Sequence, residues 1–406
     1  IANKGDAFVD DAQLGCSAPL PSGHHDSSHL LTTTGLVDGL RHLAQNWERL
    51  LFTTGGALNL QKSFWVLLTW KWDKGVATLL TPAQAPAELH LTGGYNPVPV
   101  AVPRICPRSG FRTLGVHISP SGSQHLSLKQ LRGVSLTYAT AITGSRLNRS
   151  ASLWSYLLYL MPKLAYPTPA LTLTQEECQE ILSPSLMAIL PKLHINRHTA
   201  RSIVHGPASL GGLHLPTIFS EQSSGQLSYF TGHAGLGDKT GKLLLISLTY
   251  LQLLSGSCSP VLNLPFPKYK KWIEPSWLLS LWSFMFKVGY KITIKQQWVP
   301  TIPRKYDSCL MDQFLKLGFT DTQLCTLNRC RIYLQVIFLS DITSADGSII
   351  IPDCKQGVRL ADRVSVLQWP IQERPSPSAW TLWTQALQHF ENRNRLLIPL
   401  RQWIEE

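Results

Sequence analysis

The sequence lacks a long hydrophobic run. Its longest strongly apolar stretch, residues 243–254, is interrupted by Ser, Thr and Gln and is too short to cross a bilayer. No secretory signal opens the chain. We therefore expect no membrane partner and an intracellular location, in the nucleus or the cytoplasm.

Paired cysteine motifs are also absent. The chain has eight cysteines but no C-x-x-C pair, and Cys325, Cys330 and Cys354 do not have zinc-site spacing. Free thiols in a reducing compartment are the expectation.

There is no Walker lysine loop, GxSxG elbow or kinase signature, and no acidic cluster typical of a ribonuclease H or an endonuclease.

Acidic residues are scarce relative to basic ones. The 406 residues include 37 Lys and Arg against 25 Asp and Glu, which gives a formal charge of +12. Such a surplus favours a polyanionic partner, although a basic protein without one is the alternative. The 44% apolar content indicates a globular chain, and the length is typical of two or three domains.

The most informative motif is Phe8-Val9-Asp10-Asp11, in which two apolar residues run into two adjacent carboxylates. Mg²⁺ prefers carboxylate oxygens combined with substrate phosphates. A turn between two strands could present both carboxylates at one edge, so we expect strand, turn and strand over residues 5–15. The alternative is an ordinary surface turn with two solvated aspartates, because short motifs also arise by chance.

Periodicity predicts the next elements. Apolar residues three or four apart predict an amphipathic helix over 35–51, followed by Gly55-Gly56. A strand is expected over 64–72 and its partner over 76–80. Residues 81–110 are rich in Pro and Gly and are expected to form a connector, and 111–119 are expected to form a short strand.

The character then changes to helices. Candidate helices cover 126–147, 151–165, 174–190 and 197–205, and Thr174 with Glu177 forms a candidate capping box for the third. Gly211-Gly212 interrupts the helical pattern. Residues 256–275 contain several prolines and are expected to mark a boundary. Beyond them we expect a strand pair within 331–351 and a helix around Trp380 and Trp383.

The order of these signals resembles a known family. An aromatic-x-Asp-Asp hairpin, a helix, a Gly-rich turn with Leu-x-x-x-Lys, an aromatic-x-x-Leu-Gly strand and then helices resemble the rear palm and thumb of a reverse transcriptase. The resemblance is to the enzymes of non-LTR (LINE-type) retrotransposons, and it covers about residues 3–230. The segment 211–216, Gly-Gly-Leu-His-Leu-Pro, is similar to a Gly-Gly-Leu-x-x-Pro element found downstream of the thumb in that family.

The resemblance implies roles for particular residues. Asp10 and Asp11 match the family's metal-binding motif, so they would hold Mg²⁺, next to Phe8. Lys62 corresponds to a lysine near the phosphates of the incoming dNTP, where it would neutralise charge, although a solvated lysine at a strand end is the plainer alternative. Leu114 and Gly115 correspond to the strand that grips the DNA primer on its RNA template.

One departure from the family pattern matters for activity. The family's other catalytic carboxylate and its fingers lie upstream of the Asp pair, and only seven residues precede Phe8 here. Asp6 lies on the same strand and cannot substitute. We therefore expect the sequence to be a fragment of a longer product and to have no polymerase activity by itself.

A second candidate for nucleic-acid binding lies further along the chain. Residues 268–272 read Lys-Tyr-Lys-Lys-Trp and include Lys270 and Lys271, and more lysines and aromatics follow to residue 298. Interleaved charge and aromatic rings are typical of surfaces that follow a phosphate backbone and stack on bases. Aromatic core packing with lysine heads reaching water is the alternative.

The histidine clusters are weak candidates for a metal site. His24, His25 and His29 lie in a Ser-rich segment that we expect to be a loop without a metal. His194 and His198 are four residues apart, but the zinc-protease pattern requires Glu directly after the first His, and Ile195 stands there. One exposed polar helix face is the expectation for this pair.

Together these observations predict an α+β fold. We expect an incomplete antiparallel palm sheet with helices over 1–122, a mostly helical thumb-like region over 123–255, and a mixed C-terminal region of unknown role over 256–406. The expected function is that of an RNA-directed DNA polymerase fragment with Mg²⁺. A non-catalytic nucleic-acid-binding remnant of such an element is the alternative, and a helical interaction protein is a third possibility.

Overall fold

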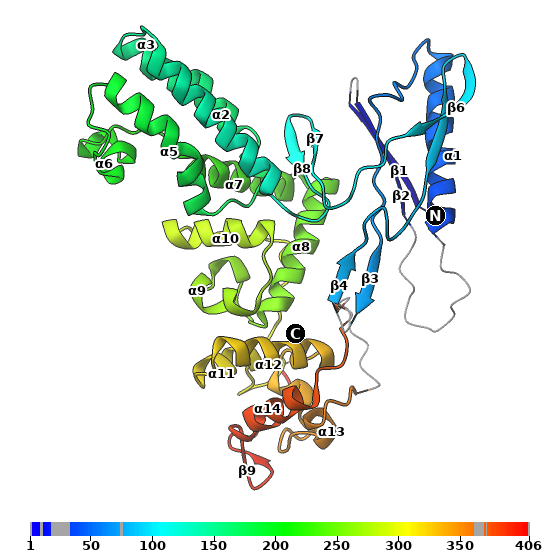
Figure 1. The fold of residues 1–406 in the computed structure, drawn as a ribbon. Helices are drawn as coiled ribbons and strands as arrows, with labels where there is room; N and C mark the ends of the chain where they lie inside the picture. Colours follow the sequence, from blue (N-terminus) through cyan, green and yellow to red (C-terminus); the bar gives the residue numbers. More distant parts are fainter. Residues whose placement is uncertain are drawn as a thin grey trace. The chain divides into compact units, whose positions relative to one another are not determined.

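The computed structural model describes residues 2–8, 11–17, 33–73, 76–360, 369–370 and 372–404. The chain divides into two compact units, Ile1–Ser127 (unit 1) and Leu128–Glu406 (unit 2). The described part is mostly helical, with small two-stranded antiparallel sheets (Figure 1). The fold is therefore α+β, as the sequence predicts.

Unit 1 is built from one long helix and several hairpins. Strand β1 (Ala2–Phe8) pairs antiparallel with β2 (Asp11–Ser17), which confirms the two expected strands; the turn expected between them lies outside the described residues. The predicted amphipathic helix is α1 (Thr33–Thr53). It packs on a small core of buried apolar residues from α1, residues 65–67 and the strands that follow: Val37, Ala44, Trp65, Leu67, Leu89, Leu91 and Val102.

Each further sheet of unit 1 is also a hairpin. The pairs are β3 (Trp70–Asp73) with β4 (Val76–Leu79), β5 (Leu89–Gly93) with β6 (Asn96–Val102), and β7 (Phe111–Thr113) with β8 (Val116–Ile118). Among the described residues, no sheet has more than two strands. The strands expected over 64–80 are thus shorter than predicted, since residues 64–69 contribute a single bridge, from Trp65 to Arg104.

Two expectations in unit 1 were wrong. Residues 81–110 are not a plain connector, because they contain the β5–β6 hairpin, whose turn is made by Gly94 and Tyr95. Residues 111–119 are not one strand but the hairpin β7–β8. In both places glycine allows the backbone to reverse, since Gly94 and Gly115 have positive φ.

Unit 2 is a succession of helices with short connections. The bounds of its first group are α2 (His125–Gly144), α3 (Arg149–Ser155), a π turn (Tyr156–Leu160), α4 (Met161–Ala165), α5 (Gln175–Lys192), α6 (Arg201–His205), α7 (Ile218–Leu236) and α8 (Lys239–Ser255). Those of the second group are α9 (Phe266–Tyr269), α10 (Trp277–Val288), α11 (Leu310–Lys316), α12 (Asp321–Leu334), α13 (Pro352–Lys355) and α14 (Pro377–Gln388), followed by β9 (Glu391–Asn392) and β10 (Arg395–Leu396).

Local signals set several of these helix ends. The predicted capping box of α5 is confirmed, because the Thr174 hydroxyl accepts from the Glu177 amide and the Glu177 carboxylate accepts from the Thr174 amide. Helix α7 ends at Gly237 with φ of 63°, and Asp238 then caps α8. These caps provide hydrogen-bond partners for backbone groups at the helix ends, which have none within the helix itself.

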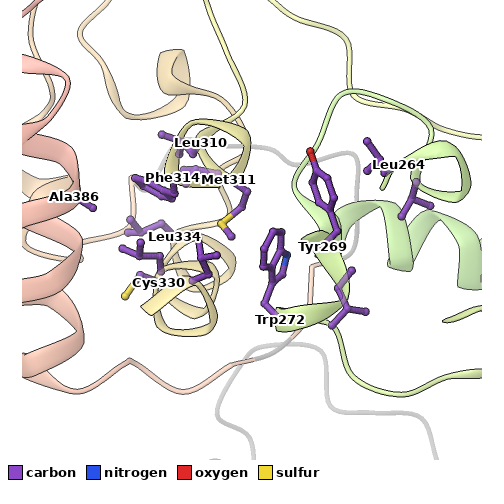
Figure 2. Close-up of a cluster of buried hydrophobic side chains, with 14 of the residues drawn as sticks. Leu264, Tyr269, Trp272, Leu310, Met311, Phe314, Cys330, Leu334 and Ala386 are labelled. Carbon is purple, nitrogen blue, oxygen red and sulfur yellow. The ribbon is translucent and has the colours of Figure 1, made fainter. Parts of the chain in front are cut away.

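Large hydrophobic cores hold unit 2 together. One core joins α2, the helix around the π turn, α5 and α6. A second core runs from Phe230 on α7 to Leu400 near the C-terminus, and so extends across residue 255. Figure 2 shows part of this second core, where Trp272 and Tyr269 face side chains of α11 and α12 such as Met311 and Leu334.

Two predictions in unit 2 were wrong. The strand pair expected within 331–351 is not formed: Arg331 lies in α12, and only a single bridge joins Thr343 to Ile350 among the described residues. The helix expected over 197–205 begins at Arg201, so His194 and His198 lie in the preceding loop and do not share a helix face.

Candidate metal-binding hairpin and nucleic-acid surfaces

Asp11 of the acidic pair begins β2 of the β1–β2 hairpin. Phe8, the last residue of β1, pairs with Asp11, the first residue of β2. Val9 and Asp10 connect them in the sequence, and both lie outside the described residues. The paired backbone of Asp11 therefore stands directly beside the link between two antiparallel strands, which is where the sequence predicts a carboxylate pair.

The hairpin is attached to α1. Leu14 of β2 packs against the core of unit 1, which includes Val37 and Ala44 of α1. Successive residues of a strand face opposite sides. The contact of Leu14 with this core therefore positions the hairpin within unit 1.

A buried carboxylate on α1 positions two other segments. The side chain of Glu48 is only 3% exposed. Its Oε2 accepts a hydrogen bond from the Leu58 amide and its Oε1 accepts one from the Gly94 amide, each at 2.6 Å. One turn earlier, Gln45 exchanges two hydrogen bonds with the backbone of Thr92. Helix α1 thereby holds both the β5–β6 hairpin and the loop after its own C-terminus.

Lys62 lies in that loop and not on a strand. Its amide donates to the backbone oxygen and the side-chain oxygen of Asn59, at 3.0 and 3.2 Å, which closes a tight turn. The Lys62 side chain is exposed. The hairpin with the acidic pair and the loop with Lys62 are thus both attached to α1.

Leu114 and Gly115 form a turn instead of a strand. Their φ angles are 46° and 82°, so both adopt the left-handed conformation that suits a two-residue hairpin. The Phe111 ring at the start of β7 contacts Phe64, with 5.0 Å between ring centres. This contact ties the β7–β8 hairpin to the loop of Lys62.

The basic and aromatic segment 268–272 divides its side chains between core and solvent. Tyr269 and Trp272 are buried in the second core of unit 2 (Figure 2), as the core-packing alternative expects. Lys270 and Lys271 are exposed, and the Lys271 Nζ forms an ion pair with Asp321 at 2.6 Å. These two aromatic rings are therefore not free to stack on bases.

A different aromatic surface lies on the helix from α3 to α4. Trp154, Leu158, Tyr159 and Tyr166 are 58%, 69%, 56% and 65% exposed, and the Lys163 Nζ lies 3.8 Å from the centre of the Tyr159 ring. We call these five residues the 154–166 face.

The π turn explains how this face arises. The amide of Met161 donates to the oxygen of Tyr156, five residues earlier. Such a turn holds one residue more than an α turn, so Trp154 and Tyr159, five apart, come nearer to the same side of the helix. Tyr156, Leu160 and Leu164 meanwhile remain fully buried.

The 154–166 face lies in a stretch without acidic residues. Between Glu88 and Glu176 the sequence contains no Asp or Glu but eight Lys and Arg: Arg104, Arg108, Arg112, Lys129, Arg132, Arg146, Arg149 and Lys163. Most of the formal charge of +12 thus comes from this stretch. Counting charge by segment would have found it, and aromatic residues out of phase with the apolar stripe would have indicated the exposed face.

No sequence model of a protein family, no curated protein and no solved structure matches the chain. Among the described residues, none of the helices combines the length and the hydropathy that a bilayer span requires.

Proposed function

We propose that this chain is part of an RNA-directed DNA polymerase of the kind found in non-LTR retrotransposons, with the rear of the palm in its first part and the thumb following. The antiparallel pairing of Phe8 with Asp11 supports the proposal most, because it puts Asp11 at the start of β2, next in sequence to Asp10. The resemblance in the order of sequence signals supports the same assignment.

The two carboxylates are ligands of the type that magnesium prefers. Asp10 and Asp11 offer hard carboxylate oxygens, which Mg²⁺ binds together with phosphate oxygens of a substrate. A bound pair of such ions supplies charge stabilisation to the attacking and leaving oxygens of nucleotidyl transfer. The exposed Lys62 serves to neutralise phosphate charge of the dNTP.

Other parts of the chain contact the nucleic acid. Phe8 lies beside the acidic pair, and the turn at Leu114 and Gly115 holds the primer end against the RNA template. Lys270 and Lys271 are exposed and meet the phosphate backbone electrostatically. The 406 residues contain no counterpart of the family's other catalytic carboxylate, so by themselves they extend no primer.

Primer–template binding tests the proposal. We expect the 406-residue chain to bind a labelled RNA template annealed to a DNA primer more tightly in Mg²⁺ than in EDTA, as measured by fluorescence anisotropy. The double variant Asp10→Asn/Asp11→Asn should lose this magnesium dependence. Asp6→Asn makes the same change on β1 opposite Gln13 and should retain it. Primer extension by the purified chain should be absent.

Two results would contradict the proposal. Unchanged magnesium dependence in the double variant would show that the acidic pair holds no ion. Template-dependent synthesis by the chain alone would refute the expectation of inactivity.

The second candidate is a non-catalytic nucleic-acid-binding remnant of such an element. The acid-free stretch from residue 89 to 175, together with the exposed rings of the 154–166 face, favours it. In the experiment above, tight binding that is indifferent to both Mg²⁺ and the double variant would select this candidate.

A further inference from the structure

Two cysteines and an aspartate that are distant in sequence meet in unit 2. The Sγ atoms of Cys258 and Cys309 and a carboxylate oxygen of Asp312 all lie within 4.8 Å of one another. Tetrahedral zinc with bonds to sulfur of about 2.3 Å separates two sulfurs by about 3.8 Å. The cluster is therefore within reach of metal-binding geometry by small side-chain rotations.

The backbone that carries Cys258 is fixed by a buried amide. Gln252 on α8 is fully buried. Its Nε2 donates to the oxygens of Ser257 and Ser259, on either side of Cys258, at 2.7 and 2.9 Å. Its Oε1 accepts from the Val261 amide at 2.8 Å. The loop cannot move without breaking these buried hydrogen bonds.

The other two residues share the start of α11. Cys309 is the N-cap residue and Asp312 lies in the first turn, so their side chains project from the same end of the helix. The Leu310 amide donates to the Ile337 oxygen at 2.9 Å, which anchors this helix start to the segment after α12. Both halves of the cluster are thus held by rigid backbone.

A set of donors orients the carboxylate. The Tyr269 hydroxyl donates to Oδ1 of Asp312 at 2.7 Å, and the Ser257 hydroxyl donates to Oδ2 at 3.0 Å. Tyr269 itself is fixed in the core (Figure 2). Hydrogen bonds of this kind to a carboxylate ligand are typical of metal sites, where they fix its orientation. Burial raises the pKa of Asp312 and of Cys309.

A permanent cation balances the charge of the cluster. Arg331 is fully buried and interacts electrostatically with Cys309 and Asp312. Its guanidinium donates to backbone oxygens and to Asn328, all uncharged acceptors. With both thiols protonated and Asp312 ionised, the cluster carries one negative charge. Replacing the two thiol protons by one divalent ion leaves that charge unchanged, so the cluster balances the positive charge of Arg331 with and without metal.

We propose that Cys258, Cys309 and Asp312 bind one Zn²⁺ ion. Thiolate sulfur selects zinc over magnesium or calcium, and carboxylate oxygen is compatible with zinc. Cys258 and Asp312 are partly exposed, so solvent supplies the fourth ligand. On binding, each thiol gives up its proton to solvent as its sulfur bonds to the metal. The proposal is independent of the proposed polymerase function.

Metal titration of the full chain tests the site. The chain is prepared metal-free under reducing conditions and titrated with Zn²⁺ against a chromophoric chelator, and with Co²⁺ as a spectroscopic probe. We expect one ion per chain and thiolate-to-Co²⁺ charge-transfer absorption. Cys258→Ala should lower zinc affinity by about 100-fold or more, because one of three protein ligands is lost.

Matched variants separate a ligand from a structural role. Cys106→Ala removes another partly exposed thiol, outside the cluster, and should leave affinity unchanged. Tyr269→Phe removes only the hydroxyl that orients Asp312 and should weaken zinc binding by about 10- to 100-fold while keeping the charge-transfer bands. Asp312→Asn keeps the size of the side chain and should weaken binding without losing those bands.

Three outcomes would overturn the proposal. They are a wild-type chain that binds no Zn²⁺, equal affinity in the wild type and Cys258→Ala, and a Cys258–Cys309 disulfide in protein purified without oxygen. Circular dichroism spectra that match between the wild type and Cys258→Ala ensure that lost affinity reports the site and not unfolding.

Discussion

At the scale of single residues, Glu48 connects the first helix to the segments around the candidate site. One buried carboxylate satisfies two backbone amides that belong to different loops, Leu58 before Lys62 and Gly94 at the turn of β5–β6. Hydrogen bonds to a charged acceptor are worth more than neutral ones, and an amide left buried without a partner costs free energy. Glu48 therefore determines where the loop of Lys62 begins.

Glu48→Gln tests this role. The amide side chain retains one acceptor oxygen and turns a donor toward the second backbone amide, so we expect unit 1 to lose about 1–3 kcal/mol of stability. Hydrogen exchange at Leu58 and Gly94, followed by mass spectrometry, should become faster. Glu88→Gln makes the same change on a side chain that is 83% exposed and should leave both amides unaffected. Equal exchange in the two variants would contradict this role.

At the scale of elements, the backbone conformation explains why glycine stands at positions 211 and 212. Gly211 ends a short turn with φ of 79°. Gly212 passes so close to Gly206 that an added Cβ would lie 2.2 Å from its backbone oxygen. The close approach lets the Leu213 amide reach the Ile203 oxygen at 2.9 Å, and it brings Leu215 into the core.

Gly212→Ala should push the backbone at position 212 away from the backbone of Gly206. Because the obstructing atom belongs to the backbone, we expect a loss of about 1–3 kcal/mol in unit 2, typical of overpacking. Urea unfolding followed by circular dichroism measures it, with hydrogen exchange at Leu213 as a local readout. Gly133→Ala in α2 meets no atom within 4 Å and should stabilise the helix by up to about 1 kcal/mol. A neutral Gly212→Ala would refute the close-approach argument.

Elements with local signals could be predicted from the sequence, and those set by distant contacts could not. The apolar stripe of α1 and the capping box at Thr174 depend on residues within a few positions of one another. In contrast, Ile332, Val336 and Ile337 are β-branched and predict a strand. The capping box at Thr320 and the burial of the helix that follows favour α12 at Ile332 instead, and α12 ends at Leu334, before Val336 and Ile337.

The same distinction applies to the candidate sites. The acidic hairpin could be predicted because its residues are adjacent in sequence. The cluster of Cys258, Cys309 and Asp312 could not, because its members meet only through tertiary packing. Aromatic residues out of phase with the apolar stripe could have indicated the exposure of the 154–166 face, but the alignment of Trp154 with Tyr159 depends on a π turn that helical periodicity does not predict.

At the scale of the whole molecule, charge is unevenly distributed along the chain. Eight basic residues and no acidic one lie between Glu88 and Glu176, out of a formal total of +12. Five of the eight, from Lys129 to Lys163, lie in unit 2, as does the 154–166 face. Positive charge attracts polyanions at long range, and exposed rings then add short-range stacking on bases. Both proposed functions need positive charge of this kind, since each requires nucleic acid to be held.

Single-strand binding measured at several salt concentrations separates the two contributions. Trp154→Ala should weaken binding of single-stranded RNA by about 5- to 150-fold, the equivalent of 1–3 kcal/mol for one lost stack, without changing the slope of log affinity against log salt. Arg149→Gln should instead reduce that slope by about one, because one phosphate contact is lost.

Trp403→Ala is the matched control, since Trp403 is 60% exposed but lies outside the acid-free stretch. A wild-type affinity that does not change with salt, or equal losses in the two tryptophan variants, would show that the 154–166 face does not bind nucleic acid.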